Sequence, residues 1–368
     1  MQSTPNFDQL IPDNLTKFAY QTFQEGKKIF GLVHKTIGER ITDLAIADRE
    51  NGKPLSPETL LKLQSQVKQL EETDWQDAKA GVYPPQILFD NPWLDFFRYY
   101  PEIWLDMPNM WSKIKAKKYQ TFDSKIDREG YPNYYLQNFH HQTDGYLSDS
   151  SANLYDLQVE ILFNGTADAM RRRILKPLKA ELAAFRDVPP QQLRILDVAC
   201  GTGRTLKMIR AAFEKAKLFG TDLSPAYLRK ANQLLSEIPG ELPQLLQANA
   251  EDLPYQDNYF HGVSSVFLFH ELPPNARQAV IEESFRVLQP GGTFIICDSI
   301  QEIDSPPDFR VMMENFPTLF HEPYYRHYTT DPLEERLEKA GFTNVRVENH
   351  FFSKYWVATK PTVKPVVV

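Results

Sequence analysis

The chain contains a glycine turn that is followed, at a fixed distance, by an acidic residue. The apolar run Ile195–Ala199 leads into Cys200-Gly201-Thr202-Gly203, and Asp222 ends a second apolar run 19 residues after Gly203. A strand that ends in a glycine turn and opens a helix leaves unpaired backbone N–H groups and a positive dipole end beside a crevice. Two glycines let the main chain approach a ligand, and an acid about 20 residues later can accept hydrogen bonds from ribose hydroxyls. The pattern predicts a site for a nucleoside cofactor.

Two common nucleotide fingerprints do not fit this turn. A dinucleotide site reads G-x-G-x-x-G, but Leu206 stands where the third glycine would be. A phosphate-binding P-loop needs Gly-Lys followed by Ser or Thr, and none follows Gly203. The cofactor is therefore expected to be neither a dinucleotide nor a nucleoside triphosphate.

The stretch Asp197-Val198-Ala199-Cys200-Gly201-Thr202-Gly203 resembles the first motif of class I S-adenosylmethionine-dependent methyltransferases. Later segments resemble further motifs in the family's order: Phe219–Ser224, Gln247–Pro254, Val263–Pro273 and Glu283–Thr293. The likeness continues through a closing helix at 333–341 and strands at 345–352 and 354–360, and covers about the second half of the chain. Within the family the chain is most similar to the type 11, UbiE-like group, which includes quinone, sterol and natural-product methyltransferases.

The resemblance implies that S-adenosylmethionine binds at these motifs. Asp222 would accept hydrogen bonds from the ribose, and Leu223 would cover the adenine. Asn249 stands where the family usually has Asp, so its carbonyl must point inward to accept a hydrogen bond from the adenine amino group. The residues expected to bind the cofactor are Asp197, Ala199, Cys200, Gly201, Thr202, Gly203, Thr205, Asp222, Leu223, Asn249, Ala250, Glu251 and Phe267.

His270 and Glu271 are the residues expected to take part in catalysis. A sulfonium methyl group is already activated, so the protein mainly has to hold an acceptor in line with it in a dry pocket. If the acceptor is a hydroxyl, or a ring carbon beside one, a base that removes its proton helps, and imidazole suits that task. His270 ends the fourth predicted strand, where ligands of open α/β sheets gather, and Glu271 could orient it. The alternative is that His270 only caps the strand or packs under the cofactor.

Residues 83–155 are rich in aromatic side chains and prolines. Aromatic side chains have large areas to bury, so this segment is expected to fold against the rest of the chain. Plain core packing is the alternative to a role in binding the methyl acceptor. A second aromatic segment, Ser305–Tyr328, would cover the acceptor from another side. We expect an apolar or aromatic acceptor, lined by Tyr134, Tyr135, His140, His141 and Tyr146.

The predicted elements alternate in a way that defines the fold class. Strands near 194–199, 217–222, 244–249, 261–268 and 293–298 alternate with helices near 203–215, 225–237 and 275–288. Such alternation predicts a parallel sheet with helices on both faces. With the closing strands, we expect an α/β fold with a doubly wound, mostly parallel seven-stranded sheet, an antiparallel C-terminal strand pair and a mainly helical N-terminal lobe. The expected units are 1–152, the aromatic-rich lobe, and 153–368, the methyltransferase domain, with an insertion at about 300–330 near the acceptor.

Composition restricts the partners. The net charge is −7 with no long Lys/Arg run, which argues against nucleic acid. Cys200 and Cys297 lie on predicted buried strands, so we expect neither a disulfide nor a metal site. The N-terminus lacks a signal-peptide pattern and no apolar run is long enough to span a membrane, so a cytoplasmic location is expected. The first helix, with Lys27 and Lys28, leaves peripheral membrane contact open. The oligomeric state is also left open.

Two functions of different classes fit the sequence. The first is an enzyme that methylates an oxygen or carbon atom of a quinol-like molecule, a lipid or a natural product. The alternative is a protein that binds S-adenosylmethionine as a sensor or partner-binding module with little turnover, or a protein methyltransferase. The region after the fourth strand reads His270-Glu271-Leu272-Pro273-Pro274, which is the wrong order for the element used in adenine or amide N-methylation. The intact cofactor series favours the first function.

Overall fold

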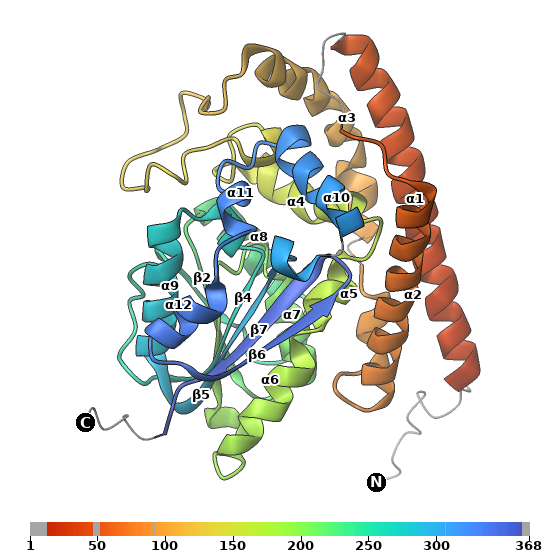
Figure 1. Ribbon diagram of the computed structural model, residues 1–368. Helices are drawn as coiled ribbons and strands as arrows, with labels where there is room; N and C mark the ends of the chain where they lie inside the picture. The colour runs from red at the N-terminus through yellow and green to blue at the C-terminus, as the bar shows by residue number, and fades with distance from the viewer. Residues whose placement is uncertain (1–12, 47–51, 92, 306, 363–368) are drawn as a thin grey trace.

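The computed structural model describes residues 13–46, 52–91, 93–305 and 307–362. Within that part of the chain, seven strands form one sheet in the order β3-β2-β1-β4-β5-β7-β6 (Figure 1). β7 runs antiparallel to its neighbours β5 and β6, and the other paired strands are parallel. The strands are β1 (Arg194–Val198), β2 (Lys217–Asp222), β3 (Gln244–Gln247), β4 (Phe260–Val266), β5 (Leu288–Ser299), β6 (Thr343–His350) and β7 (Ser353–Thr359). The predicted fold class is confirmed.

The helices account for most of the remaining described residues. They are α1 (Asp13–Ala45), α2 (Pro57–Lys79), α3 (Trp93–Ala116), α4 (Asp149–Leu162), α5 (Ala167–Arg172), α6 (Leu175–Leu182), α7 (Arg204–Ala212), α8 (Pro225–Ser236), α9 (Pro274–Val287), α10 (Pro307–Leu319), α11 (Tyr325–Tyr328) and α12 (Leu333–Lys339). None of the helices in the described part is long and apolar enough to cross a membrane. The first residues, which bear on the expected absence of a signal peptide, lie outside the described part.

Helices cover both faces of the central strands, and successive strand residues point to opposite faces. Leu196 and Val198 of β1 and Phe294 of β5 pack in a core with α9 and α12. Ile195 and Ile295, one position away, pack in a second core with α6, α7 and α8. Buried parallel strands of this kind read as continuous apolar runs, which is why the sequence indicated them clearly.

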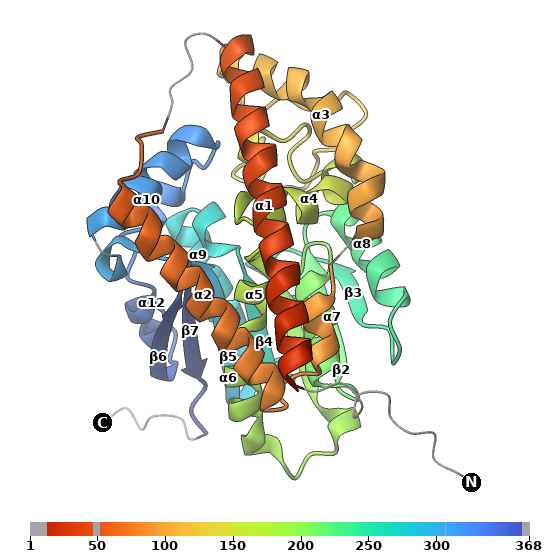
Figure 2. The same ribbon diagram turned by 90° about the vertical axis from the view of Figure 1, so that its right-hand side faces the viewer.

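The N-terminal helices lie along one flank of the sheet domain, with α1 and α2 side by side (Figure 2). A buried ion pair joins α2 to α5, with 2.7 Å between Asp74 Oδ2 and Arg172 Nη2. Tyr20 of α1 and Tyr83 donate hydrogen bonds to the same carboxylate at 2.7 and 2.6 Å. A buried charge pair is tolerated when its remaining positions are satisfied in this way. This network fixes three helices against the sheet domain.

The aromatic-rich segment contains a helix that the sequence analysis did not predict. α3 carries Pro101 and Pro108 inside its span, and prolines normally argue against a helix interior. α3 forms despite these prolines, and it packs against α4. The predicted boundary between two units, at residues 152 and 153, lies within α4. The division into two units stays a prediction.

Candidate functional site

The glycine turn lies where β1 ends, and its two glycines have different tasks. Gly201 has a φ of 55°, and a Cβ atom added there would meet nothing closer than 3.9 Å. Its missing side chain therefore leaves open space beside the backbone. Gly203 has a φ of 82° and precedes α7, and a Cβ there would lie 3.1 Å from the Cβ of Ala231 on α8. Gly203 therefore allows α7 and α8 to pack closely, while Gly201 keeps the turn open.

Asp222 ties the turn to the end of β2. Its Oδ2 accepts a hydrogen bond from the Gly201 backbone N–H at 2.9 Å, and its Oδ1 accepts one from Ser224 N–H at 2.8 Å. Burial raises the pKa of Asp222 to about 6. The carboxylate is thus held in one orientation at the carboxyl end of the strand, where ligands of open α/β sheets bind.

A cavity, here called the turn pocket, opens between the strand ends and the aromatic-rich segment. The space among its lining residues, with the open solvent at its mouth included, is about 770 Å³. Its lining residues are Tyr134, Tyr135, Phe139, Tyr146, Tyr155, Ala199, Gly201, Asp222, Leu223, Tyr227, Ala248, Asn249, Ala250, Val266, Phe267, Leu268, Glu271 and Leu272.

The lining of the turn pocket fits S-adenosylmethionine. Asp222 offers a carboxylate for ribose hydroxyls, and Leu223 and Ala250 offer apolar surface for a base. Several tyrosine rings face the same space, among them Tyr146 and Tyr155, and aromatic faces attract a cation such as a sulfonium. Burial leaves the Tyr135 hydroxyl without a hydrogen bond within the described part of the chain. A polar ligand atom would satisfy that buried hydroxyl.

Some residues expected to bind the cofactor do not line the turn pocket and pack around the glycine turn instead. The Asp197 carboxylate accepts a hydrogen bond from Ser264 at 2.7 Å, and burial raises its pKa to about 7. The Thr202 hydroxyl donates to Asp156 of α4. Thr205 is buried on α7, and the Cys200 thiol packs over Gly220 of β2. These side chains, unlike Gly201 and Asp222, are absent from the pocket lining.

Asn249 and Glu251 interact with each other and with the aromatic-rich segment. Asn249 Oδ1 accepts a hydrogen bond from the Glu251 backbone N–H at 3.0 Å. The amide carbonyl is thus already engaged by the main chain. Glu251 in turn accepts a hydrogen bond from the Tyr134 hydroxyl at 2.6 Å. The third motif therefore anchors residues 131–135 over the turn pocket.

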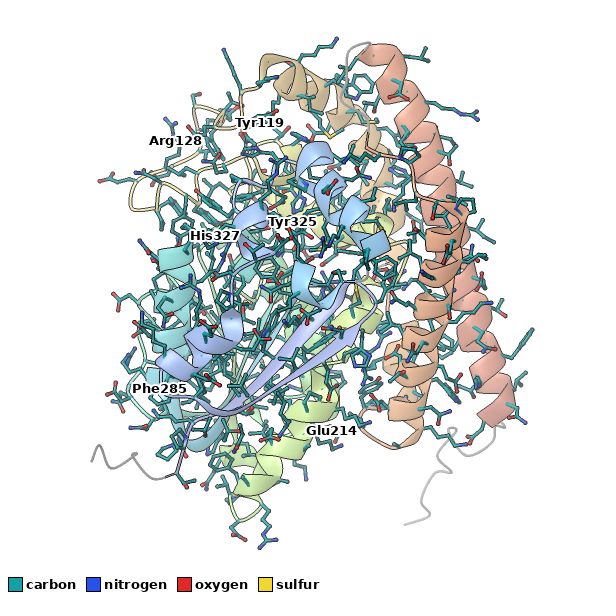
Figure 3. The ribbon with its side chains drawn as sticks, in the orientation of Figure 1. Tyr119, Arg128, Glu214, Phe285, Tyr325 and His327 are labelled. Carbon is teal, nitrogen blue, oxygen red and sulfur yellow. The ribbon has the colours of Figure 1, made fainter. Side chains whose placement is uncertain are left out.

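A second cavity, here called the apolar pocket, adjoins the turn pocket and shares Tyr155, Phe267 and Glu271 with it. It encloses about 880 Å³ including its mouth. Most of its wall is apolar or aromatic, and Tyr325, labelled in Figure 3, contributes from α11. Its lining residues are His140, Tyr155, Val159, Leu162, Phe163, Phe267, His270, Glu271, Ser299, Ile300, Met312, Met313, Phe316, Tyr325 and Phe352.

His270 is held at the polar end of this pocket by Asp298. The distance from His270 Nδ1 to Asp298 Oδ1 is 2.7 Å. The other carboxylate oxygen accepts the Phe269 N–H at 2.6 Å, so Asp298 cannot rotate without losing that bond. Burial opposes charge on the imidazole, but the Asp298 carboxylate outweighs it and raises the pKa of His270 to about 10. The Asp298 carboxylate thus favours the protonated form of the His270 imidazole.

Three more ionisable side chains meet His270. His140 Nε2 lies 3.1 Å from Glu322 Oε1 and 3.7 Å from Glu271 Oε1, and His270 Nε2 lies 3.9 Å from the same Glu271 oxygen. Burial raises the pKa of Glu322 to about 7. Burial opposes charge on His140, but the Glu322 carboxylate prevails and raises its pKa. Tyr146 also donates a hydrogen bond to Glu271 Oε1 at 2.5 Å.

The residues expected to line the acceptor pocket divide into three groups. Tyr134, Tyr135 and Tyr146 line the turn pocket, while His140 lines the apolar pocket. His141 lines neither, and its Nε2 lies 3.2 Å from the Leu319 carbonyl oxygen. The structure thus brings most of this set to the two cavities, but mainly to the first.

The sequence analysis did not single out Asp298, Glu322 or Tyr155. Asp298 lies near the carboxyl end of β5, and the general rule for ligands of open α/β sheets could have indicated it. Tyr155 lies on α4 and lines both pockets. Glu322 follows α10 in an irregular segment, and no local pattern marks it.

Comparisons with known proteins agree with this geometry. A family model described as a methyltransferase domain matches residues 195–292. The chain is 27% identical to the ubiquinone/menaquinone biosynthesis C-methyltransferase UbiE of Photorhabdus laumondii subsp. laumondii, over 54% of this chain and 82% of that protein. It is 29% identical to a demethylmenaquinone methyltransferase of Bacillus mycoides, over 48% of this chain and 81% of that protein. A solved structure of human N-acetylserotonin methyltransferase in complex with S-adenosylmethionine is 17% identical, with a TM-score of 0.40, over 57% of this chain and 59% of that chain.

The matched residues include the features from which the site is built. Residues 195–292 contain the glycine turn, Asp222, Asn249 and the His270–Glu271 pair. Both sequence relatives are methyltransferases that align over most of their own length. The chain is therefore similar to class I methyltransferases, and its methyltransferase domain and relatives support an S-adenosylmethionine-dependent methyltransferase enzyme.

Proposed function

We propose that this methyltransferase acts on an oxygen or carbon atom of an apolar or aromatic small molecule, such as a quinol-like ring, held in the apolar pocket. The observation that carries the proposal is the contact between the two cavities. The apolar pocket, with its polar end, adjoins the turn pocket, and Tyr155, Phe267 and Glu271 line both. A pocket with mostly apolar walls and a few convergent polar groups suits a small apolar ligand with one polar substituent.

The relatives support the same substrate class. The names of the two sequence relatives refer to ubiquinone, menaquinone and demethylmenaquinone. Such molecules are apolar and carry a ring with oxygen substituents. The aromatic side chains Phe163, Phe316 and Tyr325 in the apolar pocket suit a ring of this kind.

We further propose roles for the residues at the two cavities. S-adenosylmethionine supplies an activated methyl group, so the main demands on the protein are position and exclusion of water. Asp222 and the Gly201 turn hold the nucleoside, with Leu223 and Ala250 against the adenine. Phe267 and Tyr155 close the junction of the pockets to water.

His270 and Glu271 serve the acceptor at the polar end of the apolar pocket. His270, held by Asp298, donates a hydrogen bond to an acceptor oxygen. Glu271 is the carboxylate that faces both pockets, and it receives the proton that the acceptor loses on gaining the methyl group. In this proposal His270 is a hydrogen-bond donor, and not the base that the sequence analysis expected, because the Asp298 carboxylate favours the protonated imidazole.

Incubation with methyl-labelled S-adenosylmethionine tests the proposal. The purified protein is offered a small-molecule extract and, separately, a reduced naphthoquinone as a defined probe. We expect label in the organic-soluble small-molecule fraction. Label confined to a polypeptide band would support a protein methyltransferase instead. Tight binding of S-adenosylmethionine without transfer to any fraction would support the sensor or partner-binding alternative.

A further inference from the structure

The polar end of the apolar pocket contains two histidines and two glutamates in one cluster. We propose that His140, His270, Glu271 and Glu322 form a binding site for a divalent transition-metal cation. Each side chain offers one ligand atom, and these four atoms all lie within 4.8 Å of one another. Nothing in the sequence analysis indicated a metal site, because the four residues come from three separate segments.

The distances within the cluster suit a shared cation. Around a tetrahedral ion with bonds of about 2.0–2.1 Å, neighbouring ligand atoms lie about 3.4 Å apart. His140 Nε2 lies 3.1 Å from Glu322 Oε1 and 3.7 Å from Glu271 Oε1. His270 Nε2 lies 3.9 Å from the same Glu271 oxygen. Small side-chain rotations would bring all four atoms to one ion.

His270 is oriented in the way that protein metal ligands usually are. Its Nδ1 bonds to Asp298, which leaves Nε2 directed at the cluster. A carboxylate that fixes one imidazole nitrogen while the other binds metal is a common outer partner in zinc sites. Glu271 has an outer partner as well, the hydroxyl of Tyr146 at 2.5 Å.

Glu322 provides the independent observation that points to a ligand. Its side chain is completely buried, with 0% of its surface exposed. Neither of its carboxylate oxygens makes a hydrogen bond within the described part of the chain, and its Oε1 lies 3.1 Å from His140 Nε2, which forms an ion pair only when that imidazole is protonated. A buried carboxylate without hydrogen bonds is costly, and proteins rarely retain one without a partner. A cation in the cluster would supply that partner.

The ligand set indicates the kind of cation. Imidazole nitrogen suits zinc, iron, nickel and copper, whereas sites for magnesium and calcium are built from oxygen. Two imidazoles and two carboxylates therefore favour a first-row transition metal such as Zn²⁺. His140, His270 and Glu271 line the apolar pocket and Glu322 lies behind them. A bound cation would replace the proton on His270 Nε2, and an acceptor oxygen would then meet the cation in place of the hydrogen bond from His270. This use rests on the proposed function, whereas cation binding does not.

Calorimetric titration of the chelator-treated full chain with Zn²⁺ tests the site directly. We expect saturable binding with one Zn²⁺ per chain, and visible absorption bands of a low-coordinate site when Co²⁺ replaces Zn²⁺. Glu322→Gln keeps the shape of the side chain but removes its charge. His140 has a φ of 53°, a conformation that Asn tolerates well, so His140→Asn keeps the backbone. Each variant is expected to raise the Kd for Zn²⁺ by at least about tenfold.

A matched control separates the cluster from nonspecific binding by histidine. His350, at the end of β6, pairs with Glu348 and belongs to neither pocket. His350→Asn should leave the Kd unchanged. Binding of S-adenosylmethionine, whose pocket neither His140 nor Glu322 lines, confirms that each variant is folded. Absence of saturable Zn²⁺ binding, or equal Kd values for wild type, Glu322→Gln and His140→Asn, would overturn the proposal. No methyl acceptor is present, so this outcome is independent of the label-transfer experiment.

Discussion

The turn pocket and the apolar pocket meet at Glu271 but have different structural foundations. The strand side of the turn pocket comes from the carboxyl ends of adjacent strands β1, β2 and β4 and from the segment after β3. The apolar pocket takes its walls from α4, α10, α11, the turn between β6 and β7, and the ends of β4 and β5. The first pocket is therefore fixed mainly by the sheet, and the second by how separate segments pack over it.

This difference suggests that the turn pocket is the fixed part of the site and that the apolar pocket is the part that can change. Residues in the turn pocket are held by backbone hydrogen bonds, as Asp222 is by Gly201 and Ser224. The apolar pocket depends on side-chain packing of α10 and α11, which lie over the sheet as an insertion after β5 (Figure 1). Changes in the insertion should alter the acceptor while they leave donor binding intact. The following predictions test that separation.

The largest effect is expected when Asp222 is replaced by alanine. Asp222→Ala removes the carboxylate that orders Gly201 and that we expect to hold the ribose. Hydrogen bonds to charged groups contribute about 1.5–3 kcal/mol each, so loss of two predicts a Kd for S-adenosylmethionine raised by about 100-fold or more. Calorimetry measures the change. Asp252→Ala, at an exposed residue of the loop after β3, is the control and should leave the Kd unchanged. A Kd for Asp222→Ala within about threefold of wild type would contradict the assignment.

A smaller effect is expected from a substitution in the apolar pocket. It should slow methyl transfer and leave donor binding nearly unchanged, whereas Asp222→Ala weakens donor binding. Met312 of α10 lines that pocket, and Met312→Trp would occupy part of its volume. We expect the rate of transfer to the identified acceptor to fall at least about tenfold, while the Kd for S-adenosylmethionine changes less than about twofold. Val311→Trp, the neighbouring position that lines neither pocket, is the control. Equal losses of donor binding and transfer would show that the two pockets are not separable.

The same contrast explains what the sequence could and could not predict. Apolar strands, the glycine turn and Asp222 are local patterns, and the structure has them where the sequence analysis expected the sheet and its strand ends. The contact between His140 and Glu322 depends on a short 3-10 helix, Phe139–His141, and an irregular segment that pack together, and no local pattern describes such a contact. Asp298 could have been found from its place near a strand end, but its effect on the pKa of His270 depends on a side-chain distance. α3 was missed because its prolines argue against a helix.

The third prediction concerns pH and the turn pocket. Burial raises the pKa of Asp222 to about 6, so its carboxylate becomes protonated as the pH falls through that value. A neutral acid is a weaker acceptor for ribose hydroxyls, and affinity for S-adenosylmethionine should fall by up to about tenfold per pH unit below pH 6. Asp222→Asn should remove this part of the slope.

Stability of the ligand-free protein should respond to Asp222 in the opposite direction. Because the folded pKa is raised, the folded state binds the proton more tightly than the unfolded state. The contribution of Asp222 to the free energy of unfolding therefore increases as the pH falls from about 6 towards the unfolded value of about 3.9. Denaturant titrations of wild type and Asp222→Asn at several pH values isolate this term. A donor affinity that stays flat between about pH 7 and 5 would contradict the prediction for binding.

The smallest effect is expected at the residue that links the two pockets. The Tyr146 ring lines the turn pocket while its hydroxyl donates to Glu271, the carboxylate shared with the apolar pocket. Tyr146→Phe keeps the ring and removes that hydrogen bond, so the Kd for S-adenosylmethionine should stay within about twofold. Glu271 loses the bond that orients it, and a loss of about 1 kcal/mol, the net contribution of a typical intramolecular hydrogen bond, predicts a transfer rate lower by about fivefold. Tyr259→Phe, before β4 and outside both linings, is the control. If Tyr146→Phe weakened donor binding as much as it slowed transfer, the hydroxyl would belong to the turn pocket, and Glu271 would not be the point at which the two cavities act on each other.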